Sequence, residues 1–83
     1  MAEIDFDGPD PIYRQLADVL KSRIGDGVYP PNRKIPSEAA LCSEFDVSRN
    51  TVRAALRILA GLGMVRPVVG RGVFVIPPEV KEP

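Results

Sequence analysis

Residues 36–56, with the sequence PSEAALCSEFDVSRNTVRAAL, constrain the fold of this chain more than any other segment. Ser37 and Ser48 are favoured helix N-cap residues, and each stands just before a segment with helical spacing. Between the two segments, residues 45–47 leave space for a turn of only about three or four residues. The spacing therefore predicts a helix-turn-helix whose second helix covers residues 49–60.

The predicted second helix has a cationic and an apolar face. At 100° per residue from Arg49, Arg53 and Arg57 lie at about 40° and 80°. The apolar residues lie between about 240° and 340°: Val52, Ala55, Leu56 and Leu59. Such a helix can rest on a core with one face and enter the major groove of DNA with the other. The first helix of the pair is expected over residues 38–45.

The C-terminal part of the chain has the pattern of a β-hairpin. Residues 64–69 and 73–76 are rich in β-branched side chains and surround a Gly-Arg-Gly tripeptide at residues 70–72. Pro67 donates no backbone hydrogen bond, so its strand must lie at an edge of the sheet or contain a bulge. Residues 34–35 are expected to add a very short third strand.

A further helix is expected to begin at Pro11, with Asp10 as its N-cap, and to end at Gly25 and Gly27. Its buried stripe consists of apolar residues at helical spacing: Ile12, Leu16, Val19, Leu20 and Ile24. Residues 1–10 predict a flexible acidic lead-in. Together the elements predict a mainly helical α+β domain, a winged helix-turn-helix with three helices and a two- to three-stranded antiparallel sheet.

The composition excludes several classes of protein. The 83 residues suffice for one small domain with an ordinary apolar content of 45%. One cysteine and no histidine exclude a disulfide framework and a histidine base, so we expect no metal, no cofactor and no enzymatic activity. The acidic N-terminus is no secretory signal, and no apolar run approaches membrane-spanning length. We therefore expect a cytoplasmic protein without a membrane partner.

The formal net charge is zero, but the charges are unevenly distributed. Residues 1–10 hold four acidic and no basic side chains, whereas residues 33–75 hold seven basic and three acidic ones. The basic residues coincide with the predicted helix-turn-helix and hairpin. This distribution favours a nucleic-acid partner over a merely solvated charged surface.

Six motifs, in one order and spacing, resemble the winged-helix DNA-binding head of the GntR family of bacterial transcription regulators. They cover most of the chain, from residue 11 to residue 76: Pro11-Ile12-Tyr13-Arg14-Gln15, Gly27 with Pro30-Pro31, Lys34-Ile35-Pro36-Ser37-Glu38, Val47-Ser48-Arg49-x-Thr51-Val52-Arg53 with Ala55-Leu56, Gly63-Met64-Val65, and Gly70-Arg71-Gly72-Val73-Phe74-Val75. The combination is specific, although each motif alone is weak.

The resemblance implies sequence-specific binding of double-stranded DNA by a transcription regulator, which we expect to be a repressor. Its recognition helix 49–60 would enter the major groove, and its wing 64–76 would lie at the minor groove. Residues 11–76 would form the DNA-binding domain. Residues 77–83 would be a linker toward a C-terminal effector and oligomerisation domain that this chain lacks. The implied partners are an inverted-repeat operator, a second copy of the chain, and a small-molecule effector if that further domain exists.

Arg49 and Arg53 are the residues that we expect to read bases, because an arginine can donate two hydrogen bonds to guanine. The family's contact arginines fall at these two positions. Asn50 is exposed on the same helix and can pair with adenine or touch the DNA backbone. Thr51 matches the family's phosphate-contacting hydroxyl, or it only stabilises the first helical turn. Arg57 is expected either to contact a phosphate or to remain solvated.

Ser37 and Ser48 are predicted N-caps, and the amides exposed at each helix N-terminus also favour an anionic phosphate. The two roles are compatible, because they use neighbouring donors. Lys34 precedes the first of these helices and is expected to touch a flanking phosphate. Glu38 lies in the first helical turn, and we interpret it as structural.

In the wing, Gly70 and Gly72 permit backbone shapes that are closed to other residues and a close approach to DNA. Arg71, between them, is expected to probe the minor groove, which attracts arginine where it is narrow. The alternative for this tripeptide is a tight hairpin without a ligand.

Four positions depart from the family pattern. Asp46 occupies the turn where the family has glycine, so we expect a preserved turn at some cost in stability. Cys42 replaces alanine and is interpreted as a small core residue. Ala39 stands where some members place a base-contacting arginine, so we do not expect that base contact in this chain. Val73 replaces the common threonine of the wing.

Two other functions are compatible with this kind of fold. A winged helix can serve as a protein-interaction or dimerisation module without specific DNA binding, although the arginines on the second helix argue against this. Some relatives fuse the same head to an aminotransferase-like pyridoxal-phosphate domain. This chain has no room for that domain and carries no catalytic motif.

Overall fold

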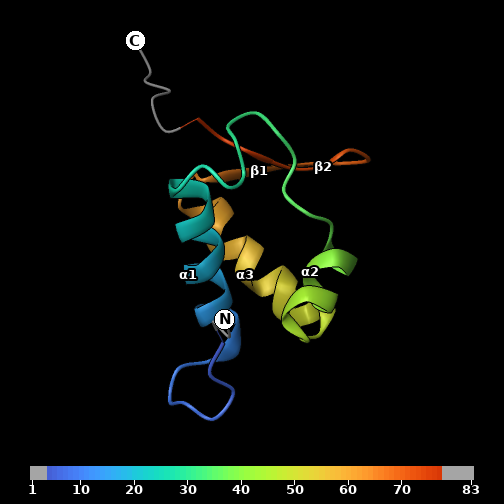
Figure 1. Cartoon of the computed structure of the whole chain (residues 1–83). Coiled ribbons are helices and arrows are strands. Elements are labelled where there is room, and N and C mark those ends of the chain that lie inside the picture. The colour runs from blue at the N-terminus through green and yellow to red at the C-terminus, as the bar shows by residue number, and fades with distance from the viewer. Residues whose placement is uncertain (1–3, 78–83) are drawn as a thin grey trace.

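Three helices are followed by a β-hairpin in the computed structural model, which describes residues 4–77 (Figure 1). The elements occur in this order: α1 (Ile12–Gly25), α2 (Glu38–Phe45), α3 (Arg49–Gly61), β1 (Val65–Val68) and β2 (Gly72–Val75). This arrangement confirms the predicted winged helix-turn-helix fold. The predicted linker at residues 77–83 lies outside the described residues except for its first residue.

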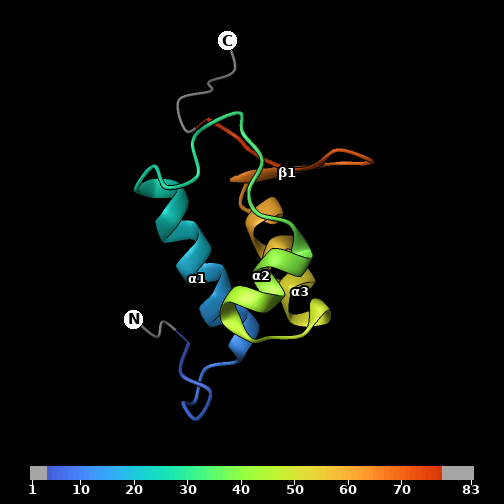
Figure 2. The same cartoon turned by 45° about the vertical axis from the view of Figure 1, so that its right-hand side comes forward.

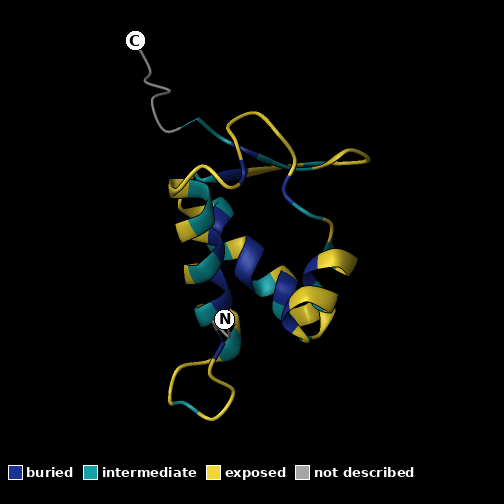
Figure 3. Cartoon of the chain, viewed as in Figure 1, coloured by how far each residue is buried: buried dark blue, intermediate teal, exposed yellow. Residues whose placement is uncertain are grey.

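Helix α3 is the centre of the domain. It packs against α1 and α2 and, at its C-terminal end, against β1. Figure 3 shows the buried stretches of α1 and α3 facing one another. The buried residues of α3 are those that its helical spacing placed on the apolar face: Val52, Ala55, Leu56 and Leu59. Each fully buried aliphatic side chain stabilises the fold by about 1.5–3 kcal/mol relative to an exposed one, so this stripe fixes which face of α3 meets solvent.

Helix α1 begins one residue later than predicted. The N-cap is Pro11, with an extended ψ of 144°, and its carbonyl accepts from the amides of Arg14 and Gln15. The prediction of Asp10 as N-cap was therefore wrong. Proline fits the capping position because it has no N–H group to satisfy. Of the predicted stripe, Leu16 and Leu20 are fully buried, and the other members are half-buried against the core.

The chain ahead of α1, which the sequence predicts to be a flexible lead-in, contacts both the core and α1. Ile4 is buried in the core. The Gln15 side chain accepts a hydrogen bond from the Asp5 amide at 2.7 Å and donates to the Asp5 carbonyl at 2.9 Å. It also donates to the Asp10 carbonyl at 2.9 Å. One glutamine amide thus fastens residues 5–10 to α1. Residues 1–3 lie outside the described part of the chain.

The wing is an antiparallel hairpin in which Val65 pairs with Val75 and Val68 with Gly72. Strand β1 is shorter than the predicted run at 64–69, whereas β2 has the predicted length but begins one residue earlier than the run at 73–76, so Gly72 belongs to β2 instead of the tip. The expected third strand is a single antiparallel bridge between Lys34 and Phe74. In both views the hairpin lies beyond the C-terminal end of α3 and its tip points away from α1 (Figures 1 and 2).

Pro67 lies in β1, which is the edge strand, as predicted. Its partner across the ladder is Val73. The Val73 carbonyl accepts from the Ile35 amide at 2.9 Å on the opposite side of β2. At this register position the polar groups of β2 therefore face away from β1, and the missing N–H of proline costs no ladder hydrogen bond.

Candidate nucleic-acid interface

The two helices of the helix-turn-helix begin at serine caps. Ser37 Oγ accepts from the Ala40 amide at 3.1 Å, and Ser48 Oγ accepts from the Thr51 amide at 3.2 Å. Both predicted caps are confirmed. The Thr51 hydroxyl lies 3.0 Å from Ser48 Oγ, so it also takes part in the cap of α3. Replacing such a cap by alanine typically costs about 1 kcal/mol.

The turn between α2 and α3 depends on Asp46. This residue has φ 57° and ψ 51°, a left-handed conformation that glycine adopts more readily than other residues, so the expected turn is preserved without glycine. Its amide donates to the Cys42 carbonyl, as does the Val47 amide at 3.1 Å. These two bonds supply donors to a backbone carbonyl in the last turn of α2 and fix the direction in which α3 leaves the turn. Cys42 is half-buried and packs against the core.

The outward face of α3 carries the predicted contact residues. Arg49, Asn50, Arg53 and Arg57 are all exposed, whereas Thr51 is half-buried beside its cap. The apolar stripe on the opposite side holds this face toward solvent. The structure thus presents three guanidinium groups and one amide on a helix whose other face is anchored.

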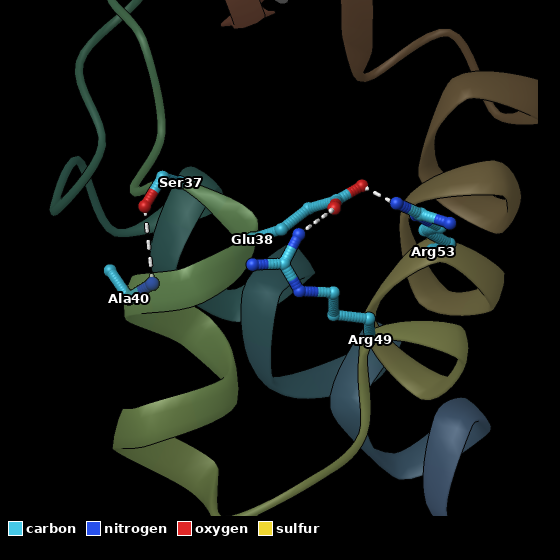
Figure 4. A network of polar contacts seen from close by, with 5 residues as sticks. All are labelled: Ser37, Glu38, Ala40, Arg49 and Arg53. Carbon is cyan, nitrogen blue, oxygen red and sulfur yellow. Dashed lines mark hydrogen bonds and ion pairs between the residues drawn. The ribbon is translucent and has the colours of Figure 1, made fainter.

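Glu38, at the first residue of α2, lies between two of these arginines (Figure 4). Its Oε2 accepts a hydrogen bond from Arg53 Nε at 2.9 Å, and its Oε1 lies 3.7 Å from Arg49 Nη1. The hydrogen bond from Arg53 lowers the pKa of Glu38. The same bond raises the pKa of Arg53. Our sequence interpretation gave Glu38 only a helix-dipole role, so it missed this pairing across 15 residues of chain.

An open groove of about 690 Å³ separates the helix-turn-helix from the wing. Its walls include residues of three segments: the approach to α2, the start of α3 and the hairpin tip. Six of the predicted site residues line it: Lys34, Ser37, Arg49, Gly70, Arg71 and Gly72. The other five lie outside the groove, on α3 and its cap: Ser48, Asn50, Thr51, Arg53 and Arg57.

Gly72 lies against the Lys34 side chain. A Cβ atom at Gly72 would lie 2.9 Å from Cδ of Lys34, and the glycine has φ 128°. A larger residue at this position would displace the aliphatic stem of Lys34 and adopt an unfavourable backbone conformation. Gly72 therefore lets Lys34 cross the hairpin at the edge of the groove.

The hairpin tip consists of residues 69–71, between the paired residues Val68 and Gly72. The Arg71 amide donates to the Val68 carbonyl at 2.9 Å, and Gly70 has φ 78°. The Arg71 side chain is exposed. Beside it, Val69 is 100% exposed, an apolar side chain at the end of the wing that our sequence reasoning did not single out. Its only sequence signal was its place next to the Gly-Arg-Gly tripeptide.

Fold and side chains together define a winged helix-turn-helix domain, in which the cationic helix α3 lies beside a basic wing. Residues 12–75 match the family described as bacterial regulatory proteins, gntR family. The chain belongs to this family, as its motifs indicated. The family and its named relatives are transcription regulators.

Curated relatives support this assignment. The chain is 38% identical over 79 residues to the HTH-type transcriptional repressor NagR of Bacillus subtilis, covering 95% of this chain and 32% of that protein. It is 43% identical over 68 residues to the mannosyl-D-glycerate transport/metabolism system repressor MngR of Escherichia coli, covering 82% of this chain and 28% of that protein. The chain thus spans about a third or less of the length of these relatives.

Solved structures agree with the sequence relatives. The AraR DNA-binding domain in complex with operator ORX1 has a TM-score of 0.81 and 38% identity, with 88% of this chain and 94% of that chain covered. YtrA from Sulfolobus acidocaldarius, a GntR-family transcription factor, has a TM-score of 0.77 and 34% identity, with 95% of this chain and 82% of that chain covered.

Among residues 4–77, no helix is long and apolar enough to cross a bilayer.

Proposed function

We propose that this chain binds double-stranded DNA sequence-specifically as the DNA-binding domain of a transcription repressor. The observation that carries the proposal is the joint presentation of an anchored, arginine-rich helix and a basic wing on either side of one groove. A recognition helix needs an apolar face to rest on and a polar face to read base edges, and α3 has both. The match to a DNA-binding domain solved with its operator supports the same conclusion.

In the proposed complex, α3 enters the major groove and the wing reaches the adjacent minor groove. Arg49 and Arg53 read guanine, and Asn50 reads adenine or contacts the backbone. The helix N-termini capped by Ser37 and Ser48 face phosphates. The remaining predicted contacts go to the sugar-phosphate backbone and the minor groove: Lys34, Thr51, Arg57, Gly70, Arg71 and Gly72. Residues 11–76 form the binding unit, and the protein works in the bacterial cytoplasm, at the nucleoid when bound.

A single domain of this size buries only about 600–1,000 Å² on DNA, so one copy binds weakly. Tight binding requires two copies on an inverted repeat, with half-site centres about one helical turn apart. We assign dimerisation and any response to a small-molecule effector to a further domain, of the kind that the longer proteins of the family carry.

The test is selection of a preferred duplex from a randomised pool, followed by a salt titration of binding to that duplex by fluorescence anisotropy. With about 4–6 phosphate contacts per domain, log K should fall with log salt at a slope of about −4 to −5. Arg49→Ala should relax the preference at particular base pairs, while Thr51→Ala should weaken all sequences about equally. Salt-independent binding, or a pool that yields no preferred sequence, would contradict the proposal.

A further inference from the structure

One carboxylate from α2 holds two arginines of α3. Arg53 Nε donates to Glu38 Oε2 at 2.9 Å, whereas Arg49 Nη1 lies 3.7 Å from Oε1, too far for a hydrogen bond (Figure 4). Arg53 is therefore fixed by a directed bond, and Arg49 only by charge attraction. The carboxylate is itself well placed, since Glu38 lies in the first turn of a helix capped by Ser37.

The atom used in this bond determines what Arg53 can still do. A guanidinium offers five N–H donors in a planar fork, and Nε supplies one of them. With Nε bound to Glu38, Nη1 and Nη2 donate no hydrogen bond to any residue of 4–77 in the structure. This terminal pair is a fork that matches O6 and N7 of guanine. Glu38 thus binds the Nε side of the Arg53 guanidinium and leaves Nη1 and Nη2 available for a base.

The charge of Glu38 has a second consequence. Its side chain is 32% exposed on a surface that faces a polyanion in the proposed complex. A carboxylate there repels phosphates and competes with them for Arg49 and Arg53. The competition is strongest where an arginine could make a sequence-independent phosphate contact. By contrast, Nη1 and Nη2 of Arg53 can bind a base edge while Nε keeps its bond to Glu38.

We propose that Glu38 is a positioning and specificity-determining residue, which holds Arg53 with its terminal nitrogens toward the bases and weakens sequence-independent phosphate binding. This inference rests on the proposed function, because it assigns a role within the same DNA-binding surface. It predicts that loss of the carboxylate lowers the ratio of specific to non-specific affinity and does not lower affinity for DNA in general.

The first experiment compares wild type, Glu38→Gln and Glu38→Asp on the selected duplex and on a scrambled duplex at one salt concentration. Glu38→Gln removes one negative charge, so binding to the scrambled duplex should strengthen by a few fold, while the specificity ratio falls by about tenfold. Glu38→Asp keeps the charge but is one methylene shorter, so the ratio should fall without stronger scrambled binding. An unchanged ratio in both variants would overturn the proposal.

Glu44→Gln is the matched control, because it removes a carboxylate from the same helix. Glu44 pairs with Arg23, 2.7 Å away, and it does not line the groove. This variant should retain the wild-type specificity ratio. Circular dichroism melting of every variant shows which ones are folded, and the Asp variant keeps the test decisive if Gln destabilises the domain.

Coupling between the two residues is tested in an Arg53→Ala background. If Glu38 acts through Arg53, adding Glu38→Gln to Arg53→Ala should change the specificity ratio less than twofold, whereas in an Arg49→Ala background most of the effect should remain. Equal, additive effects in both backgrounds would overturn the assignment to Arg53. NMR of the DNA-free protein supplies an independent readout, since the Arg53 Nε–H should exchange slowly in wild type and rapidly in Glu38→Gln.

The outcomes separate this inference from the proposed function. If wild type discriminates the selected duplex and Glu38→Gln discriminates it equally well, only the positioning role is wrong. If wild type itself binds selected and scrambled duplexes alike, the proposed function fails, and the specificity role of Glu38 fails with it. A slowly exchanging Arg53 Nε–H would then identify a structural ion pair alone.

Discussion

Arg23 connects three parts of the domain, and its replacement gives a sharp test of the structure. From α1, its Nη2 lies 2.7 Å from Glu44 Oε2 on α2, and its Nη1 donates to the Tyr29 hydroxyl at 2.9 Å. Its Cζ lies 4.9 Å from the centre of the Phe45 ring. The bonds to Glu44 and Tyr29 raise the pKa of Arg23 further above its ordinary value, so the group stays charged at every working pH.

The expected cost of Arg23→Ala follows from these contacts. The ion pair has side chains 22% and 43% exposed, and a pair so accessible to solvent contributes about 0.5 kcal/mol. The hydrogen bond to Tyr29 adds about 1 kcal/mol, and the contact with Phe45 adds about 0.5–1 kcal/mol. The variant should therefore lose about 2–2.5 kcal/mol of unfolding free energy. For a domain of this size that loss lowers Tm by about 8–20 °C.

Urea unfolding followed by circular dichroism at pH 7 measures this loss for Arg23→Ala, Arg23→Lys and Glu44→Gln. Lysine keeps the charge but cannot use a planar fork for two partners and a ring, so it should lie between wild type and alanine. Glu44→Gln should cost only about 0.5 kcal/mol, because it removes the solvent-screened pair alone. If Arg23→Ala stays within about 0.5 kcal/mol of wild type, or lysine fully replaces arginine, the reasoning from these contacts is refuted.

Three further predictions concern the turn, the wing and the arginine pair. Asp46→Gly should raise the unfolding free energy by about 0.5 kcal/mol, because glycine has no Cβ to strain at φ 57°; a lower urea midpoint would contradict the turn argument. Arg71→Ala should leave stability within about 0.5 kcal/mol but weaken DNA binding, most of all on A·T-rich flanks, and equal loss on G·C-rich flanks would argue against minor-groove readout. The lowered pKa of Glu38 places its NMR titration midpoint below the ordinary value of about 4.3. The contribution of the Glu38 pair to stability should be complete above that value and be lost as pH falls through the lowered pKa. Arg53→Ala should return the midpoint toward the ordinary value, and an unchanged midpoint would show that the pair does not form in solution.

Local sequence rules predicted much of this fold because they act over a few residues. Ser37 and Ser48 marked the starts of α2 and α3, since a cap bonds an amide only three residues ahead. The apolar spacing of α3 decided which face is buried, and hence where Arg49 and Arg53 point. The Gly-Arg-Gly tripeptide placed the hairpin tip to within one residue.

Contacts between distant segments could not be predicted in this way. Whether Glu38 reaches Arg53 depends on how α2 crosses α3, and that crossing is set by packing of the whole core around α3. The same holds for Ile4, which is buried in the core next to the point where the Gln15 side chain bonds the Asp5 amide. Sequence periodicity describes spacing within one segment, so it predicts neither contact.

The sequence by itself therefore determined the elements, their caps and the cationic face of α3, because those depend on spacing along one segment. Only the tertiary structure decided which charges meet. It joined Glu38 to two arginines, placed Lys34 and the wing on the walls of one open groove, and left Val69 fully exposed at the tip. Each of these depends on distances between segments that are far apart in the chain, and those distances exist only after the core has packed.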